Sequence, residues 1–203
     1  MSRHLTNARR EPGSSPNGFT LIETLVAVAI ITIAVAGPLY SADRAIVAAD
    51  GSRYQLIASY LAQEGIEYVR AMRDNEYLAA YQAGGLNVSS TSWSSFISGS
   101  DAGSITQCRP TTCTLDPVLR PMGTGSGFAL NTCSGSSCTP LYLANGVYTQ
   151  QSGIFGAALT PFTRTVQAIT ISPSEERIVS TVSWNFHGTP YTVVIADNLT
   201  AWQ

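Results

Sequence analysis

The sequence Gly18-Phe19-Thr20-Leu21-Ile22-Glu23 opens the most apolar stretch of the chain, which continues through residues 24–42 as TLVAVAIITIAVAGPLYSA. Between Phe19 and Ala42 the one charged residue is Glu23. An α-helix rises 1.5 Å per residue, so about 24 residues are enough to cross roughly 30 Å of hydrocarbon. A charge at membrane depth is costly and is usually retained for a function. We therefore expect a membrane helix in which Glu23 has a specific task.

A polar leader, residues 1–18, precedes this stretch. It contains three arginines and two prolines, and nothing in it predicts a packed element. The positive-inside rule keeps a basic segment of this kind in the cytosol. Two plainer interpretations stay open: a single-span anchor, and a secretory signal peptide cleaved at the small-x-small sequence Ala34-Val35-Ala36. Against the signal peptide, Glu23 lies inside its apolar region and the helical pattern continues further along the chain.

The helical pattern continues from Asp43 to about Gln82 in a segment without proline. A helix that is continuous from Phe19 would have about 64 residues and a length of about 95 Å. Gly84-Gly85 is a plausible stop signal. One face of this second half collects apolar and small residues at steps of three and four, which predicts packing against a folded domain. These residues are Tyr54, Ile57, Ala58, Leu61, Gly65, Tyr68, Val69 and Met72.

Residues 84–140 differ in composition from the helix before them. The stretch GGLNVSSTSWSSFISGSDAGSITQ is rich in serine and glycine, with Trp93, Phe96 and Ile97 as its few large apolar residues. Composition of this kind predicts a long irregular excursion with short structured pieces.

Four cysteines fall in two pairs of equal spacing, Cys108 with Cys113 and Cys133 with Cys138. Behind a membrane-targeting N-terminus, disulfides formed outside the reducing cytosol are the default. Four cysteines allow three connectivities, which sequence cannot choose between, and two local pairs are the simplest. A zinc site is the competing interpretation, although no histidine lies near. We expect neither a metal nor another cofactor.

Beyond residue 141 the apolar residues alternate with polar ones, which predicts strands. Asn145-Gly146 is a strong hairpin signal between residues 141–144 and 147–150. Short connections between the later strands predict an antiparallel meander packed on the long helix, an α+β fold. The three expected strands cover residues 162–172, 177–187 and 191–202, with turns at 173–176 and 188–190.

The sequence gives little support to an enzyme. Its two histidines are His4 in the leader and His187 at an expected strand end, and no phosphate-binding loop, zinc-protease or nucleophile-elbow motif occurs. The formal net charge of −2 gives no electrostatic support to nucleic-acid binding. Asn87-Val88-Ser89 and Asn198-Leu199-Thr200 fit the glycosylation triplet, which occurs often by chance. We predict a protein that is not an enzyme.

The sequence Gly18-Phe19-Thr20-Leu21-Ile22-Glu23, with a basic leader before it and an apolar run after it, resembles the class III signal of type IV pilins and type II secretion pseudopilins. The resemblance covers roughly the first quarter of the chain. It implies one long N-terminal helix whose second half is embedded in an antiparallel sheet. The periodicity predicts the same pilin-like layout.

The resemblance also implies roles for individual residues. A prepilin peptidase would cut between Gly18 and Phe19 and methylate the new amine of Phe19. Glu23 would pair with the Phe19 amine of a neighbouring subunit as the helix is drawn into a fibre. Gly37 and Pro38 would mark a segment that kinks or melts in the fibre, because proline removes a backbone hydrogen bond and clashes with the preceding turn.

The function that this resemblance implies is that of a minor type IV pilin, acting in adhesion, motility or DNA uptake. The alternatives are a pseudopilin of a secretion or competence machine, and an anchored or secreted domain without a fibre role. All four cysteines precede the meander and the head is larger than in compact major subunits, which favours a minor pilin or a pseudopilin. The expected partners are other pilin subunits, the prepilin peptidase and an inner-membrane assembly platform.

We expect four segments along the chain. Residues 1–18 would form the cytosolic leader, residues 19–42 the transmembrane and assembly half of the helix, residues 43–83 its amphipathic half, and residues 84–203 the head. The protein would lie in the inner membrane before assembly, and in an extracellular or periplasmic fibre afterwards.

Overall fold

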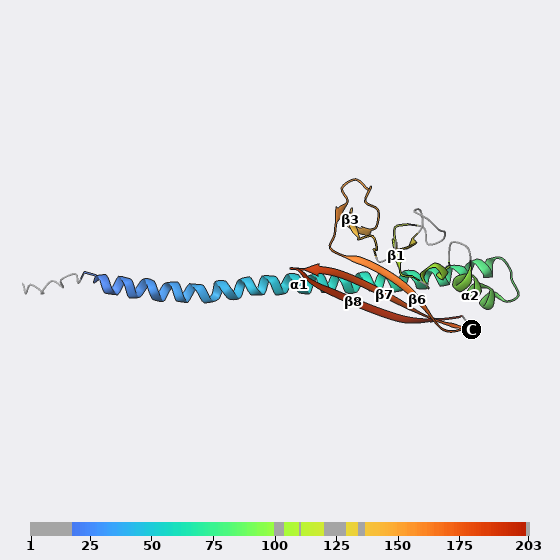
Figure 1. Cartoon of the computed structure of the whole chain (residues 1–203), viewed down its shortest axis with the longest axis horizontal. Coiled ribbons are helices and arrows are strands. Elements are labelled where there is room, and N and C mark those ends of the chain that lie inside the picture. Colours follow the sequence, from blue (N-terminus) through green and yellow to red (C-terminus); the bar gives the residue numbers. More distant parts are fainter. Residues whose placement is uncertain (1–17, 100–103, 110, 120–128, 134–136, 202–203) are drawn as a thin grey trace, which may run out of the picture. The chain divides into compact units, whose positions relative to one another are not determined.

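The computed structural model describes residues 18–99, 104–109, 111–119, 129–133 and 137–201 (Figure 1). The chain divides into two compact units, one ending at Ala49 and the other beginning at Asp50. A long N-terminal helix precedes antiparallel sheets, and its second half packs against the larger of them. The predicted α+β, pilin-like fold is confirmed.

Helix α1 runs from Leu21 to Gln82, 62 residues, and contains Pro38. It begins two residues later than expected, because Thr20 caps it. Its end agrees with the prediction: Gly84 adopts a φ of 72°, the left-handed conformation in which glycine terminates a helix.

The part of α1 in the first unit is exposed along its whole described length. Every residue from Gly18 to Asp50 is exposed. The most apolar 18-residue window of α1 has a mean hydropathy of 2.1 and is 0% buried. By length and composition α1 is the one helix, among the described residues, that could cross a membrane.

In the second unit one face of α1 is buried, and it is the face that the sequence predicts. Two buried residues of this face, Ala62 and Ile66, are not among the predicted ones. Of the predicted residues, Tyr54, Ile57 and Tyr68 are only partly buried. The buried α1 residues of this unit are Ala58, Leu61, Ala62, Gly65, Ile66, Val69 and Met72.

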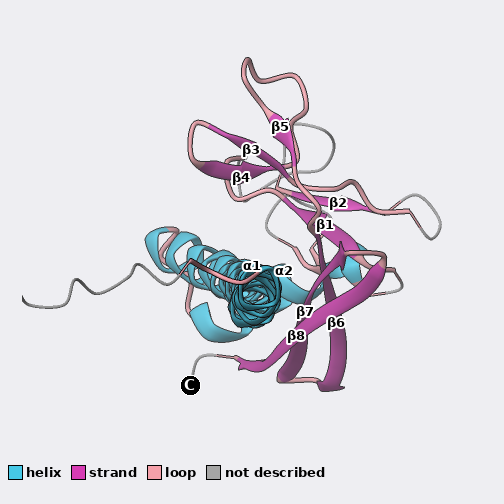
Figure 2. Ribbon diagram, turned by 90° about the vertical axis from the view of Figure 1, so that its left-hand side faces the viewer, coloured by secondary structure: helices cyan, strands magenta, loops and turns pink. Residues whose placement is uncertain are grey.

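This face lies against a five-stranded antiparallel sheet of order β2-β1-β6-β7-β8 (Figure 2). In β7 the inward residues Ile178, Ser180, Val182 and Trp184 alternate with more exposed ones. The predicted meander is therefore confirmed. The strands are β1 Cys113–Leu115, β2 Leu130–Thr132, β6 Thr163–Ser172, β7 Glu175–Phe186 and β8 Thr189–Thr200.

The turn between β7 and β8 lies one residue earlier than predicted. His187 and Gly188 form it with φ values of 50° and 82°. Two consecutive residues with positive φ match the twist of a two-residue hairpin. Pro190 is consequently part of β8, an edge strand in the described sheet, where proline is tolerated.

A second, three-stranded sheet has the order β4-β3-β5. Its β3–β4 hairpin turns at Asn145-Gly146, with φ values of 51° and 81°, which confirms the predicted turn. The strands are β3 Tyr142–Ala144, β4 Val147–Thr149 and β5 Ala158–Leu159.

Residues 88–98 are one of the short structured pieces expected within the excursion after α1, and they form helix α2 (Val88–Ser98). Trp93 and Phe96 are buried and Ile97 is partly buried in the main core. Their spacing of three and four places them on one helical face, and their burial outweighs the weak helix propensity of the serines. A short 3-10 helix, η1 (Thr106–Cys108), follows.

α1 approaches β7 closely at Gly65. A Cβ atom at this position would lie 2.5 Å from Ser180 Oγ and 3.3 Å from Ser180 Cβ. Any side chain here would have to displace Ser180, so the approach of the helix to the sheet favours glycine.

We expect Gly65→Ala to destabilise the second unit by about 1–3 kcal/mol through overpacking. Gly51→Ala is the matched control: its Cβ would meet only Phe186 Cε1 at 3.6 Å. Better helix propensity should then raise stability by about 0.5–1 kcal/mol. Urea unfolding of the full chain in detergent, followed by tryptophan fluorescence, measures both. Equal effects of the two substitutions would contradict the close approach.

Candidate assembly site

Gly18 and Phe19 lie just before α1, outside the helical hydrogen bonding. Phe19 is 77% exposed, and no atom lies within 4 Å of a Cβ built on Gly18. The peptide bond between them is accessible and non-helical, as a protease substrate requires. Cleavage at this bond stays a prediction.

Thr20 caps α1. Its side-chain Oγ1 accepts the backbone N–H of Glu23 at 3.4 Å, and its carbonyl accepts the N–H groups of Glu23 and Thr24. Thr20-x-x-Glu23 has the capping-box spacing, a signal that our sequence analysis missed. The cap places Glu23 in the first turn of the helix, where the dipole favours a negative charge.

The hydroxyl groups that follow in the apolar run are satisfied within the helix. Thr24, Thr32 and Ser41 each donate to a carbonyl three residues back, at 2.9 Å. Internal bonds of this kind suit a helix in hydrocarbon, where water cannot serve. Glu23 is exposed, and its carboxylate makes no ion pair with the described residues. The described residues therefore supply no charged partner for the Glu23 carboxylate.

The helix continues through Gly37 and Pro38. A kink or melting at these residues in an assembled state therefore stays a prediction. Near the end of the apolar run, Arg44 Nε donates to the Tyr40 hydroxyl at 3.1 Å. Arg44 Cζ also lies 5.2 Å from the centre of the Tyr40 ring. Such aromatic and basic residues are typical of a membrane–water interface.

A buried arginine joins α1 to the sheet of the second unit. Arg164 of β6 is fully buried and donates to the carbonyls of Leu61, at 3.2 Å, and Leu115, at 2.7 Å. It also forms an ion pair with Glu64 of α1. Burial lowers the pKa of the Arg164 guanidinium, and the nearby Glu64 carboxylate opposes that shift. One side chain thus connects three elements, α1, β1 and β6.

Asp116 performs a similar role at the smaller sheet. Its buried carboxylate accepts the Thr149 hydroxyl at 2.7 Å and the N–H groups of Val118 and Gln150 at 3.1 Å each. These bonds tie the segment after β1 to the end of β4. The bonding satisfies the carboxylate structurally, so Asp116 is a poor candidate for chemistry.

Tyr68 of α1 lies within the electrostatic reach of Asp116. Its hydroxyl donates to the carbonyl of Leu119 at 2.9 Å. Burial, and secondly the Asp116 charge, raises the pKa of Tyr68 to about 12. The proton is therefore held more tightly in the folded protein.

Both cysteine pairs are local disulfides, Cys108–Cys113 and Cys133–Cys138. This is the simplest of the three connectivities, and it uses all four sulfurs, which removes the zinc alternative. Among the residues that the structure describes, no group of three or more His, Cys, Asp or Glu side chains could hold a metal. His4 lies outside the described residues, and His187 is the exposed turn residue described above.

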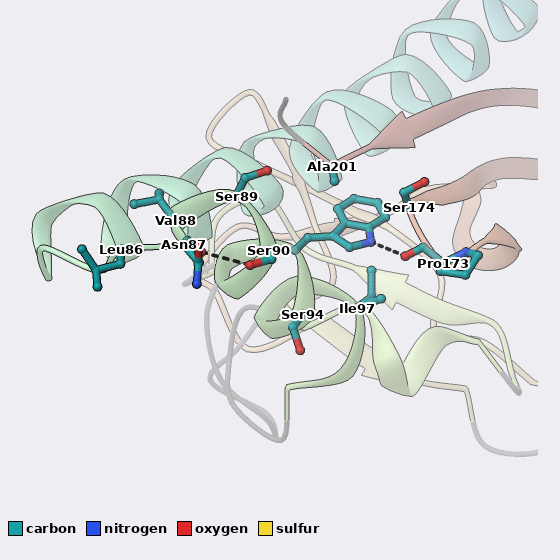
Figure 3. A pocket seen from close by; sticks show the side chains of 11 residues that line it. Leu86, Asn87, Val88, Ser89, Ser90, Ser94, Ile97, Pro173, Ser174 and Ala201 are labelled. Carbon is teal, nitrogen blue, oxygen red and sulfur yellow. Dashed lines mark hydrogen bonds between the residues drawn. The ribbon is translucent and has the colours of Figure 1, made fainter.

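A groove of about 640 Å³ lies between α2, the β6–β7 turn and Ala201 (Figure 3). Trp93 closes one wall and donates its indole N–H to the carbonyl of Pro173 at 2.8 Å. The lining residues carry no charge, and serines supply most of the polar ones. It holds no acid–base pair or nucleophile with an activating partner among these residues.

The comparisons with known proteins give a match for the N-terminal segment. Residues 14–37 match the family model of the prokaryotic N-terminal methylation motif. No curated protein and no solved structure matches the chain.

The matched stretch contains Gly18, Phe19, Glu23 and Gly37, so it covers the segment whose geometry is given above. It is a class III signal of the type IV pilin-like kind. The match supports a type IV pilin-like or pseudopilin precursor, and the one long apolar N-terminal helix fits a membrane-anchored form. The motif indicates a structural subunit rather than an enzyme.

We expect the Tyr68 proton to make stability depend on pH. Because the folded pKa is raised from 10.0 to about 12, the stability that this group contributes is complete below pH 10 and is lost as the pH rises towards 12. Tyr68→Phe should flatten this decline in urea unfolding of the full chain in detergent. Tyr81→Phe, at an exposed site of the same helix, should keep the wild-type decline. Identical pH profiles for wild type and Tyr68→Phe would refute the assignment.

Proposed function

We propose that this protein is a minor type IV pilin, a subunit that leaves the inner membrane and joins an extracellular helical fibre. The observation that carries the proposal is the uncovered apolar half of α1. Its hydroxyls are satisfied internally while Glu23 has no charged partner among the described residues, and the same stretch matches the methylation motif. Such a helix requires lipid first and other helices later.

Processing creates the partner that Glu23 lacks. A prepilin peptidase cuts between Gly18 and Phe19 and methylates the new amine of Phe19. In an apolar bundle this amine and the Glu23 carboxylate of a neighbouring subunit are both desolvated. Two opposite charges in such surroundings strongly favour the one axial register in which they meet. Glu23 thereby sets the stagger between subunits.

The segments of the chain then have distinct tasks. Residues 1–18 are removed in the cytosol, residues 19–42 span the membrane and later enter the fibre core, residues 43–83 carry the head, and residues 84–203 form it. Gly37 and Pro38 allow α1 to extend locally in the fibre, because the proline lacks one helical hydrogen bond. An inner-membrane assembly platform and other pilin subunits are the partners.

Two features favour a minor pilin over a bulk fibre subunit. Both disulfides precede the β6–β8 meander and lie in the loops around β1 and β2. The head is also larger than in compact major pilins. Disulfide-bonded surface loops are where binding specificity usually lies. A pseudopilin of a secretion machine would share the same N-terminal segment, so the location of the mature protein distinguishes the two.

We expect the mature protein to begin at N-methyl-Phe19 and to be present in fibres sheared from the cell surface. Mass spectrometry of its N-terminal peptide and of the sheared fraction measures both properties. The same mature N-terminus on a subunit that never reaches sheared fibres would identify a pseudopilin. A start near Gly37 would contradict both, because it indicates ordinary signal-peptide cleavage.

We expect Glu23→Ala to leave the protein membrane-inserted and cleaved, but to lower its incorporation into fibres by about tenfold or more, because the Phe19 amine loses its buried partner. Thr32→Ala is the control on the same helix: it removes a hydroxyl bonded only within the helix, to Ala29. Quantitative immunoblots of membrane and fibre fractions compare the two. Normal incorporation of the Glu23 variant would remove this account of the glutamate.

A further inference from the structure

The second unit exposes an apolar surface on the side of α1 away from its buried face. Leu56 is 56% exposed and Tyr60, one turn later, is 65% exposed. Further along the helix Gln63 and Glu67 are exposed polar residues, and two more exposed apolar residues, Leu78 and Tyr81, follow near its end. Tyr60 differs from this later pair because a groove lies beside it.

A groove of about 390 Å³ lies between α1 and the β3–β4 turn, and Tyr60 is one of its lining residues, whereas Leu56, one turn earlier, is not. Val147, 48% exposed, stands on its hairpin side. Ile57 and Tyr148 are partly buried and pack against the core that contains Phe162. The groove thus has one rigid, mostly apolar wall on the helix and another on the hairpin. It is lined by Ile57, Tyr60, Leu61, Glu64, Val147 and Tyr148, with Gly146 at the turn.

The one charged residue of the groove is already paired. Glu64 forms its ion pair with the buried Arg164, which is anchored in turn to two backbone carbonyls. An incoming ligand does not have to neutralise this carboxylate. The chemistry of the groove therefore suits an uncharged apolar partner and offers no counter-charge to an ionic one.

We propose that Leu56, Tyr60 and this groove receive the apolar N-terminal helix of a neighbouring fibre subunit. The inference rests on the proposed function and specifies a surface for it. The chain itself shows the required chemistry of the occupant: residues 24–42 form an exposed helix without a charged residue. Aliphatic side chains of such a helix fill a groove of this size and cover the two exposed residues.

The pairing of two different surfaces accounts for a fibre. A subunit that offers an apolar helix and, separately, a groove for such a helix makes a heterologous contact with the next subunit. Contacts of this type generate open helical filaments where the rotation does not close a ring. A patch that paired with itself would instead stop at a two-fold dimer.

The test is photo-crosslinking from the groove. Tyr60→p-benzoylphenylalanine is introduced into the full-length chain, fibres are irradiated and sheared, and the crosslinked peptides are mapped by mass spectrometry. We expect them to come from the N-terminal apolar helix of a second subunit. The same probe at Asn75, four turns along α1, should give about tenfold less of this product. Crosslinks to a head domain, a soluble protein or lipid, or no crosslink, would overturn the inference.

A paired substitution tests whether the contact matters. Leu56→Glu with Tyr60→Glu should lower fibre incorporation by about tenfold, because unpaired carboxylates in an apolar contact are costly. Asn75→Glu should not lower it. Cleavage, membrane insertion and urea unfolding serve as folding controls. Unchanged incorporation of the paired variant also overturns the inference.

The two proposals can fail separately. If the wild-type chain begins at N-methyl-Phe19 and is present in fibres, but Tyr60 captures no apolar helix, the groove assignment alone is wrong. If the wild-type chain is not cleaved before Phe19, the fibre function is wrong and the groove assignment falls with it.

Discussion

The constraint on which the rest of this structure depends is an apolar helical surface that the chain cannot bury by itself. Every residue from Gly18 to Asp50 is exposed in the described protein, although the run is apolar enough to cross a membrane. Hydrophobic burial is the largest favourable term in folding and association, so such a surface requires lipid or other helices. The internal bonds of Thr24, Thr32 and Ser41 make the helix suitable for either environment. The first half of α1 is therefore a surface that suits contact with lipid or with other apolar helices.

The apolar face of the second half of the same helix is buried against the sheet of the same chain. Gly65 allows α1 to approach β7, and Arg164 ties α1 to β1 and β6 through two carbonyls and Glu64. Arg164 is the buried member of this ion pair, and its loss would leave the two carbonyls without their donor, so the Arg164 contacts favour one register between helix and sheet. Within the second unit the head is therefore joined to the second half of α1 through packed side chains.

Glu23 is the charged residue of the apolar half of α1 and the residue that we propose to act in assembly. The capping bond from Thr20 holds it in the first turn, and no charge among the described residues compensates it. The helix dipole stabilises a carboxylate at the start of an apolar helix only in part. In the proposed fibre the amine of a neighbouring subunit would supply the remainder. The proposed groove beside Tyr60 would add apolar area to a contact whose register the charge pair sets. Specificity and adhesion between subunits would thus come from different residues.

The sequence by itself determined the features that follow from local periodicity and turn chemistry. It predicted the apolar run, the buried face of α1, the Asn145-Gly146 hairpin and the meander, because each depends on residues close together in the chain. It also predicted the N-terminal signal that the methylation motif confirms. Composition predicted a short structured piece near Trp93 and Phe96 but not that it is helical, since burial of these residues against distant ones outweighs the weak helix propensity of the serines. Only the tertiary structure decided the burial of Arg164 and the close contact at Gly65, because each depends on segments far apart in the sequence that become neighbours in the fold. It also selected the two local disulfides from the three connectivities that four cysteines allow.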